Sequence, residues 1–162
     1  MKSFLDFITK VEKVVAAITV FSLTALIVSD IFSRELLNSG LAWAQKSAVY
    51  FMIWAGFLGA SLASSHGAHL RPEIADKLWP EKSKNLFFGL QNFFIATFCI
   101  AGSYFGYNYL QESIELGDSD PILGLPLWIV QIIIPITFLL MGFKHSVYAF
   151  NKDLRPVKKG FH

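Results

Sequence analysis

The chain has little charge and almost no cysteine. Of its 162 residues, 16% are Asp, Glu, Lys or Arg, whereas soluble domains carry about 25%. The single cysteine, Cys99, excludes an intrachain disulfide and a cysteine-rich metal site. The net charge of +2 leaves no basic surface of the kind that binds nucleic acid. The motifs of P-loop NTPases, dinucleotide-binding domains, zinc proteases and α/β-hydrolases are also missing. We therefore predict no catalytic, cofactor or metal site, and no enzyme.

Apolar residues are abundant instead. They make up 54% of the chain, with 16 Phe, and the mean hydropathy is +0.48. A membrane-spanning helix needs about 20 mostly apolar residues, and the sequence offers four such runs, at about 14–32, 48–65, 86–110 and 123–143. These runs are too long and too uninterrupted for the strands of an outer-membrane barrel. The sequence predicts an all-α membrane protein whose residues 1–162 form one domain of four transmembrane helices.

The first run could be mistaken for a signal peptide, because Lys2, Lys10 and Lys13 precede it. No small-residue cleavage site follows it, so we predict an uncleaved anchor. The stretch 2–13 carries apolar residues near one helical face. It is expected to form an interfacial helix, with a simple extension of the first span as the alternative.

The distribution of cations predicts the orientation. Of the 14 Lys and Arg residues, only Arg34 and Lys46 lie in the connections after the first and third spans. The other twelve lie at the N-terminus, in the connection after the second span, or in the tail 144–162. Because cytoplasmic segments collect Lys and Arg, both termini are expected in the cytoplasm.

The connection after the second span predicts a short amphipathic helix at about 73–79. It lies between Pro72 and Pro80, which suit the start and the end of a helix. Its expected membrane anchors are Trp79 and the cations Arg71 and Lys77. An ordinary polar loop is the alternative.

Three features within the spans concern packing. Asp30 and Arg34 are four residues apart and are interpreted as a structural ion pair near the end of the first span. Pro135 is expected to kink the fourth span, which would free the carbonyl of Gln131. Small residues spaced by four predict close helix packing, against another span or a second protein: Ala55, Gly59 and Ala63; Gly56, Ala60 and Ser64; Gly102 and Gly106.

The middles of the spans carry no charged residue, although transporters place such groups on their transport pathways. This absence favours an accessory or scaffold subunit over a self-contained channel or carrier. A third hypothesis is a haem-binding membrane anchor that uses His66, His69 or His145.

The order of the motifs resembles a known family, the small membrane subunit of tripartite ATP-independent periplasmic (TRAP) transporters. The resemblance is carried by Trp43-Ala44-Gln45-Lys46 and the following Phe51–Ala60 run, by Gly67-Ala68-His69-Leu70 with Glu73 and Leu78-Trp79-Pro80, and by Leu125-Pro126-Leu127-Trp128 with Ile134-Pro135. It covers nearly the whole chain. One departure is that the family often has Glu two or three residues after the first Trp, where this chain has Gln45 and Lys46.

The resemblance implies a scaffold subunit in a bacterial cytoplasmic membrane, embedded in the lipid bilayer. It would brace a separate, large, elevator-type subunit that couples sodium to transport of an organic anion, sialic acid or a C4-dicarboxylate. It would also help to dock a periplasmic substrate-binding protein. The expected contacts with the large subunit are Trp43, Gln45, Lys46, Trp54, Ala55, Gly56, Gly59, Ala60, Ala63 and His69. The expected docking residues are the acids of the third connection, Glu112, Glu115, Asp118 and Asp120.

Overall fold

A computed structural model describes residues 2–65, 84–151 and 154 of the chain. Within these ranges the elements are α1 (Lys2–Leu37), α2 (Ala42–Ser65), α4 (Lys84–Glu115), α5 (Trp128–Gln131) and α6 (Ile133–Phe150). Four helical stretches are long and apolar enough to cross a membrane, with α5 and α6 counted together, which confirms the predicted fold class. Residues 66–83 lie outside the described residues. They include the predicted helix at 73–79 with its anchors Arg71, Lys77 and Trp79, and also His66 and His69.

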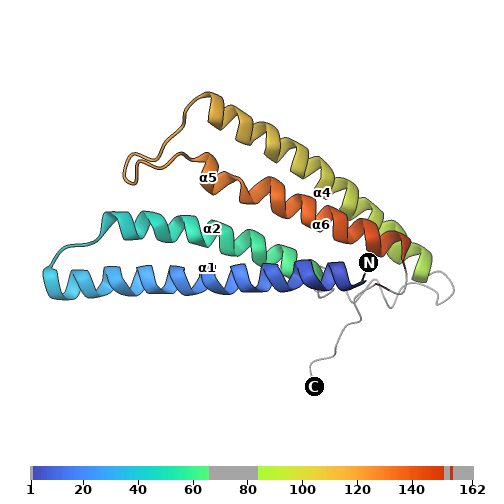
Figure 1. Ribbon diagram of the computed structural model, residues 1–162, viewed down its shortest axis with the longest axis horizontal. Coiled ribbons are helices and arrows are strands. Elements are labelled where there is room, and N and C mark those ends of the chain that lie inside the picture. Colours follow the sequence, from blue (N-terminus) through green and yellow to red (C-terminus); the bar gives the residue numbers. More distant parts are fainter. Residues whose placement is uncertain (1, 66–83, 152–153, 155–162) are drawn as a thin grey trace, which may run out of the picture.

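The first two helices form an antiparallel hairpin (Figure 1). α1 is one continuous helix from Lys2, so the expected separate interfacial helix at 2–13 is wrong and the extension of the first span is confirmed. Its last turn is followed by Asn38 at a φ of 51°, a left-handed conformation that asparagine tolerates at helix ends. Asp30 then accepts a hydrogen bond from the backbone N–H of Leu41 at 2.7 Å, which fixes the turn into α2.

The second hairpin consists of α4, a loop and the broken pair α5–α6 (Figure 1). α4 ends in a Schellman motif, in which Gly117 at a φ of 67° lets the N–H of Asp118 reach the carbonyl of Ser113 at 3.1 Å. The loop 116–127 folds back on itself through a bridge between Ser119 and Pro126. Consequently the helix of the fourth span begins at Trp128, a few residues after the predicted start at about 123.

The fourth span breaks at Ile132, between α5 and α6. This confirms the predicted kink, because Pro135 has no N–H to donate to the carbonyl of Gln131. The glycines of α4 allow close packing against α6: a Cβ on Gly102 would lie 3.1 Å from the ring of Phe138, and one on Gly106 would lie 3.2 Å from Ile134. The predicted packing role of Gly102 and Gly106 is therefore between spans of this chain.

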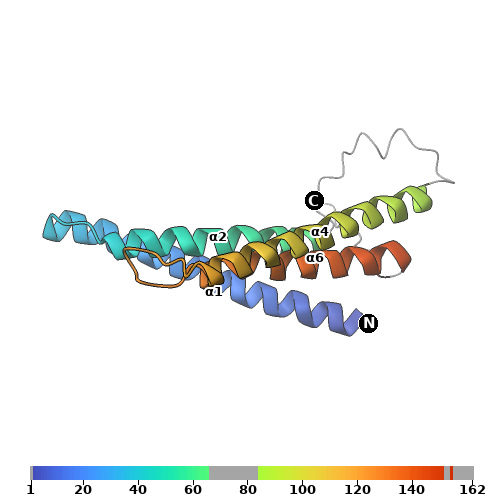
Figure 2. The same ribbon diagram turned by 90° about the horizontal axis from the view of Figure 1, so that it is seen from above.

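Both hairpins turn at the same end of the molecule, which we call the turn end (residues 38–41 and 116–127). The opposite end, with the N-terminus of α1 and the last turns of α6, is the termini end. The hairpins lie close together at the termini end and diverge toward the turn end (Figure 1), and a view from above shows the same elongated bundle (Figure 2). This arrangement separates two polar clusters, one at each end.

Candidate functional site

A buried ion pair joins the two hairpins at the termini end. The ammonium of Lys144 on α6 donates to Glu12 on α1 at 2.5 Å and to the hydroxyl and carbonyl of Ser61 on α2. The Ser61 hydroxyl in turn donates to the other carboxylate oxygen of Glu12 at 2.7 Å. Lys144 and Glu12 are only 1% and 4% exposed. Three spans are therefore tied through charges that have no access to solvent.

A second buried chain of polar groups adjoins the first and includes the remaining span. The Nε2 atom of His145 on α6 lies 2.6 Å from the Ser64 hydroxyl on α2, and its Nδ1 lies 2.8 Å from Oδ1 of Asn92 on α4. Because the Asn92 amide donates to the carbonyl of Phe88, its oxygen faces the histidine, so Nδ1 carries a hydrogen. Together the two chains form a layer across all four spans, which we call the polar layer: Glu12, Ser61, Ser64, Asn92, Lys144 and His145.

Sequence reasoning missed the polar layer. The first predicted span began at about 14 and the fourth ended at about 143, so Glu12 and Lys144 were left outside the membrane. Lys144 and His145 were assigned to a cytoplasmic tail. In the structure α6 continues to Phe150, and the side chains of Glu12 and Lys144 are both buried. The available signal was the pair Ser61 and Ser64, one turn apart on an apolar helix.

The haem hypothesis loses support at His145. Both of its ring nitrogens lie within hydrogen-bond distance of protein atoms, so neither is open to an iron atom. Among the described residues, no group of three or more His, Cys, Asp or Glu side chains could hold a metal ion.

A second polar cluster holds the hairpins together at the turn end. Asp120, only 2% exposed, accepts the hydroxyl of Tyr50, the ammonium of Lys46 at 3.1 Å, and the backbone N–H groups of Ile122 and Leu123. Burial raises the pKa of Asp120, but these hydrogen bonds outweigh burial and hold the pKa well below its ordinary value. The carboxylate is thus a permanent anchor that fixes loop 116–127 on α2.

The structure places the predicted docking acids in two different settings. Glu112, Glu115 and Asp118 are exposed at the turn end. Asp120 is enclosed within the chain, so the docking role expected for it does not fit its position.

Two residues that were predicted to contact the large subunit form side-chain contacts within this chain instead. Lys46 pairs with Asp120, and the Gln45 amide donates to Asp30 at 3.2 Å. Asp30 also pairs with Arg34 at 2.9 Å, which confirms the predicted structural ion pair. At the two positions where the family often has Glu, this chain thus has Gln45, which bonds Asp30, and Lys46, which bonds a carboxylate of loop 116–127.

The small residues of α2 lie on both sides of the helix. Gly56, Gly59 and Ala60 are exposed, and a Cβ built on either glycine would meet nothing within 4 Å. Trp43 is 51% exposed, whereas Ala55 and Ala63 are half-buried. Trp54 faces the other hairpin and donates its indole N–H to the carbonyl of Val130 at 3.1 Å. The face formed by Gly56, Gly59 and Ala60, which we call the glycine face, therefore has no partner among the described residues.

Known proteins with similar sequences are subunits of TRAP transporters. The chain is 22% identical over 142 residues to the ectoine TRAP transporter small permease protein of Halomonas elongata, covering 88% of this chain and 74% of that one. It is 27% identical over 119 residues to the C4-dicarboxylate TRAP transporter small permease protein of Rhodobacter capsulatus, covering 68% and 49%. It is 26% identical over 78 residues to the sialic acid TRAP transporter permease protein of Haemophilus influenzae, covering 48% of this chain and 13% of that one.

A sequence profile of the family described as tripartite ATP-independent periplasmic transporters, DctQ component, matches residues 23–155. This match includes α2, α4, α5, α6 and part of α1. With four spans, the protein is a multi-pass protein of the bacterial inner membrane. The chain therefore belongs to the DctQ family and is a small permease subunit of a TRAP transporter.

Proposed function

We propose that this subunit is a scaffold that braces a separate large membrane subunit. The observation that carries the proposal is the glycine face, because small residues exposed on a membrane helix allow a second helix to approach closely. Only 11% to 39% of the most apolar stretch of each span is buried within the chain. Most of the apolar surface of the spans is therefore left for lipid or a partner. Contacts at Ala55 and Ala63 would extend the same interface, because each lies four residues from Gly59 on α2. A contact at Trp43 would belong to another side of the helix, about 140° from Gly56.

The buried charges do not form a transport pathway. Glu12 is paired with Lys144, Asp30 with Arg34, and Asp120 with Lys46. A transport pathway needs polar groups that can exchange partners with a solute or an ion. Here these charged groups are already paired within the chain. This favours a scaffold role for this subunit, with solute binding on the large one.

We infer that the assembled transporter takes up an organic anion, sialic acid or a C4-dicarboxylate, together with sodium. The named relatives carry three different solutes in their names, and their identities to this chain, 22% to 27%, are similar. We propose that the other subunits select the solute.

Reconstitution tests this function. Vesicles holding this chain and the large subunit, with the binding protein outside, are expected to accumulate labelled sialic acid or C4-dicarboxylate when sodium is high outside. Vesicles with this chain alone should accumulate neither. Uptake by this chain alone, or full uptake after it is omitted, would contradict the scaffold function. Uptake of ectoine in place of both anions would reassign the solute but leave the scaffold function intact.

We also propose that the exposed acids at the turn end help to dock the binding protein. This requires the turn end to face the periplasm, as the cation distribution predicts. Replacing Glu112, Glu115 and Asp118 together by Lys should reduce uptake at limiting binding protein by about tenfold and restore it at saturating amounts, because rim charges mainly change the association rate. Reversal of Glu35, an exposed acid on α1, is the control. Unchanged uptake would remove the loop from docking.

A further inference from the structure

Loop 116–127 is held in one shape by its own hydrogen bonds. The backbone N–H of Asp120 donates to the Leu125 carbonyl at 2.9 Å, and that of Leu127 donates to the Asp118 carbonyl at 3.0 Å, so the two sides of the loop are paired. The carboxylate of Asp120 accepts two further backbone N–H groups at the tip. A segment that is ordered before its partner arrives loses little conformational entropy on binding.

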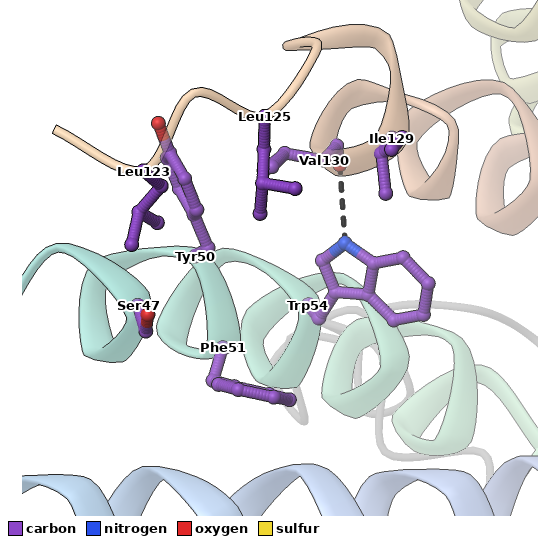
Figure 3. Close-up of a pocket in the computed structure, with 8 residues that line it drawn as sticks. All are labelled: Ser47, Tyr50, Phe51, Trp54, Leu123, Leu125, Ile129 and Val130. Carbon is purple, nitrogen blue, oxygen red and sulfur yellow. Dashed lines mark hydrogen bonds between the residues drawn. The ribbon is translucent and has the colours of Figure 1, made fainter. Parts of the chain in front are cut away.

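The inner side of the loop is attached to α2. Figure 3 shows Leu123 and Leu125 pointing from the loop toward α2, and Tyr50 reaching from α2 to the loop. The Tyr50 hydroxyl and the Lys46 ammonium both bond the carboxylate of Asp120. The loop therefore has a fixed inner side, and its outer side faces away from the bundle.

The outer side presents apolar residues beside acids. Leu116 and Ile122 are 69% and 52% exposed, and Pro121 next to Ile122 is exposed as well. The exposed acids of the turn end lie at the base of the loop and in the last turn of α4: Glu112, Glu115 and Asp118. Residues 111–127 contain no Lys, Arg or His. Exposed apolar side chains with a polar rim are typical of a protein-interaction site.

The tip of the loop lies outside the hydrocarbon of the membrane. Glu112 and Glu115 are exposed in the last turn of α4, and an exposed carboxylate is costly in hydrocarbon. From there the loop continues past the ends of α4 and α5, away from the termini end (Figure 1 and Figure 2). Phospholipid is also a poor occupant of this surface, because its phosphate would be repelled by the acids. The surface suits a protein with cations around an apolar depression.

We propose that loop 116–127 is a preformed docking site for the periplasmic binding protein, with Leu116 and Ile122 as its apolar anchors. This inference rests on the docking function proposed above for the exposed acids, and it adds the contact that retains the docked protein. Charges at a rim mainly set the association rate, whereas buried apolar anchors mainly set the dissociation rate. Asp120 is a positioning residue, because it holds the loop in the shape that the partner meets.

Binding kinetics test the two anchors. The complex of this chain with its large subunit is held in phospholipid nanodiscs, and the binding protein of the same transporter is passed over it. Leu116→Ser and Ile122→Ser are each expected to speed dissociation by about tenfold while the association rate stays within about twofold. Leu37→Ser is the matched control, because it removes a leucine that is 70% exposed from the end of α1. It should change neither rate.

Two variants of Asp120 test its positioning role. Asp120→Ala is expected to slow association by about fivefold and to speed amide hydrogen exchange in 116–127, because the loop must then become ordered during binding. Asp120→Asn keeps an acceptor for the two N–H groups of the tip and should restore most of both properties. Unchanged hydrogen exchange in Asp120→Ala would remove the positioning role.

A photocrosslinker identifies what covers the tip. Benzoylphenylalanine in place of Ile122 should crosslink to the binding protein when the assembled transporter is illuminated. Crosslinking to the large subunit or to phospholipid instead would overturn the proposal. Unchanged dissociation in both serine variants, or equal acceleration by Leu37→Ser, would overturn it as well.

Failure of the anchors can be distinguished from failure of docking. If reversal of the three exposed acids slows association but the serine variants leave dissociation unchanged, docking through the acids stands and the apolar anchors are wrong. If the acid reversal and the serine variants all leave the kinetics unchanged, the docking function proposed for this loop fails too. The scaffold function is unaffected in either case, because it is read from co-purification with the large subunit.

Discussion

Replacing Lys144 by Met is expected to destabilise the folded subunit strongly. The variant leaves the carboxylate of Glu12 buried without its cation, and breaking a buried ion pair in this way costs about 3–5 kcal/mol. For a chain of this length that loss corresponds to a fall of about 10 °C in the unfolding midpoint. Tryptophan fluorescence during heating in detergent micelles measures it.

Two further variants show whether the effect comes from the unpaired charge. Adding Glu12→Gln to Lys144→Met removes both charges while keeping an acceptor for the Ser61 hydroxyl, and it should recover most of the lost stability. Lys13→Met removes an exposed cation next to Glu12 and should leave the midpoint unchanged. If the double variant is as unstable as Lys144→Met alone, the unpaired-charge explanation fails.

Replacing Gly56 and Gly59 by Leu should separate this subunit from the large one. A Cβ at either position meets nothing within 4 Å inside the chain, so the variant is expected to fold normally and keep its unfolding midpoint. On the outside, the two leucines push a partner helix away from the close contact that small residues permit. Co-purification with a tagged large subunit should fall at least tenfold, and uptake should fall with it.

Two controls make this result specific. Thr97→Leu adds a leucine on the exposed face of α4 and should leave co-purification unchanged. Gly102→Leu inserts a side chain against Phe138 and should instead lower the unfolding midpoint of the isolated subunit. Normal co-purification of the Gly56, Gly59 variant would exclude the glycine face as the interface and leave the exposed surfaces of α1 and α4 as alternatives.

The packing role of small residues was only partly readable from the sequence. Gly102, Gly106, Gly56 and Gly59 all lie in apolar helices at four-residue or similar spacing, and nothing in that spacing distinguishes an internal contact from an external one. The first two pack against α6, whereas the last two face outward. The difference depends on how each hairpin is rotated about its axis, which is decided by contacts between residues far apart in the chain.

The acidic loop illustrates the same limit. Asp118 and Asp120 are two residues apart and are equivalent as far as the sequence shows. The fold exposes Asp118 but buries Asp120. The loop turns back after Asp120, because the backbone N–H of Gly124 donates a hydrogen bond to the Asp120 carbonyl at 2.8 Å. Lys46 and Tyr50 then supply the partners that make burial of a carboxylate possible.

The four spans, the Asp30–Arg34 pair and the break in the fourth span could all be predicted from the amino-acid sequence. These features depend on the length of apolar runs, on side chains four residues apart and on the missing N–H of Pro135, which are all local properties of the chain. The burial of Lys144 and His145 in the polar layer, in contrast, depends on how the helices pack. A charged or polar side chain can remain buried only where partners from other helices satisfy it. Glu12 and Ser61 reach Lys144, and Ser64 reaches His145, only after the two hairpins have packed together, while Asn92 reaches His145 once α4 has packed against α6.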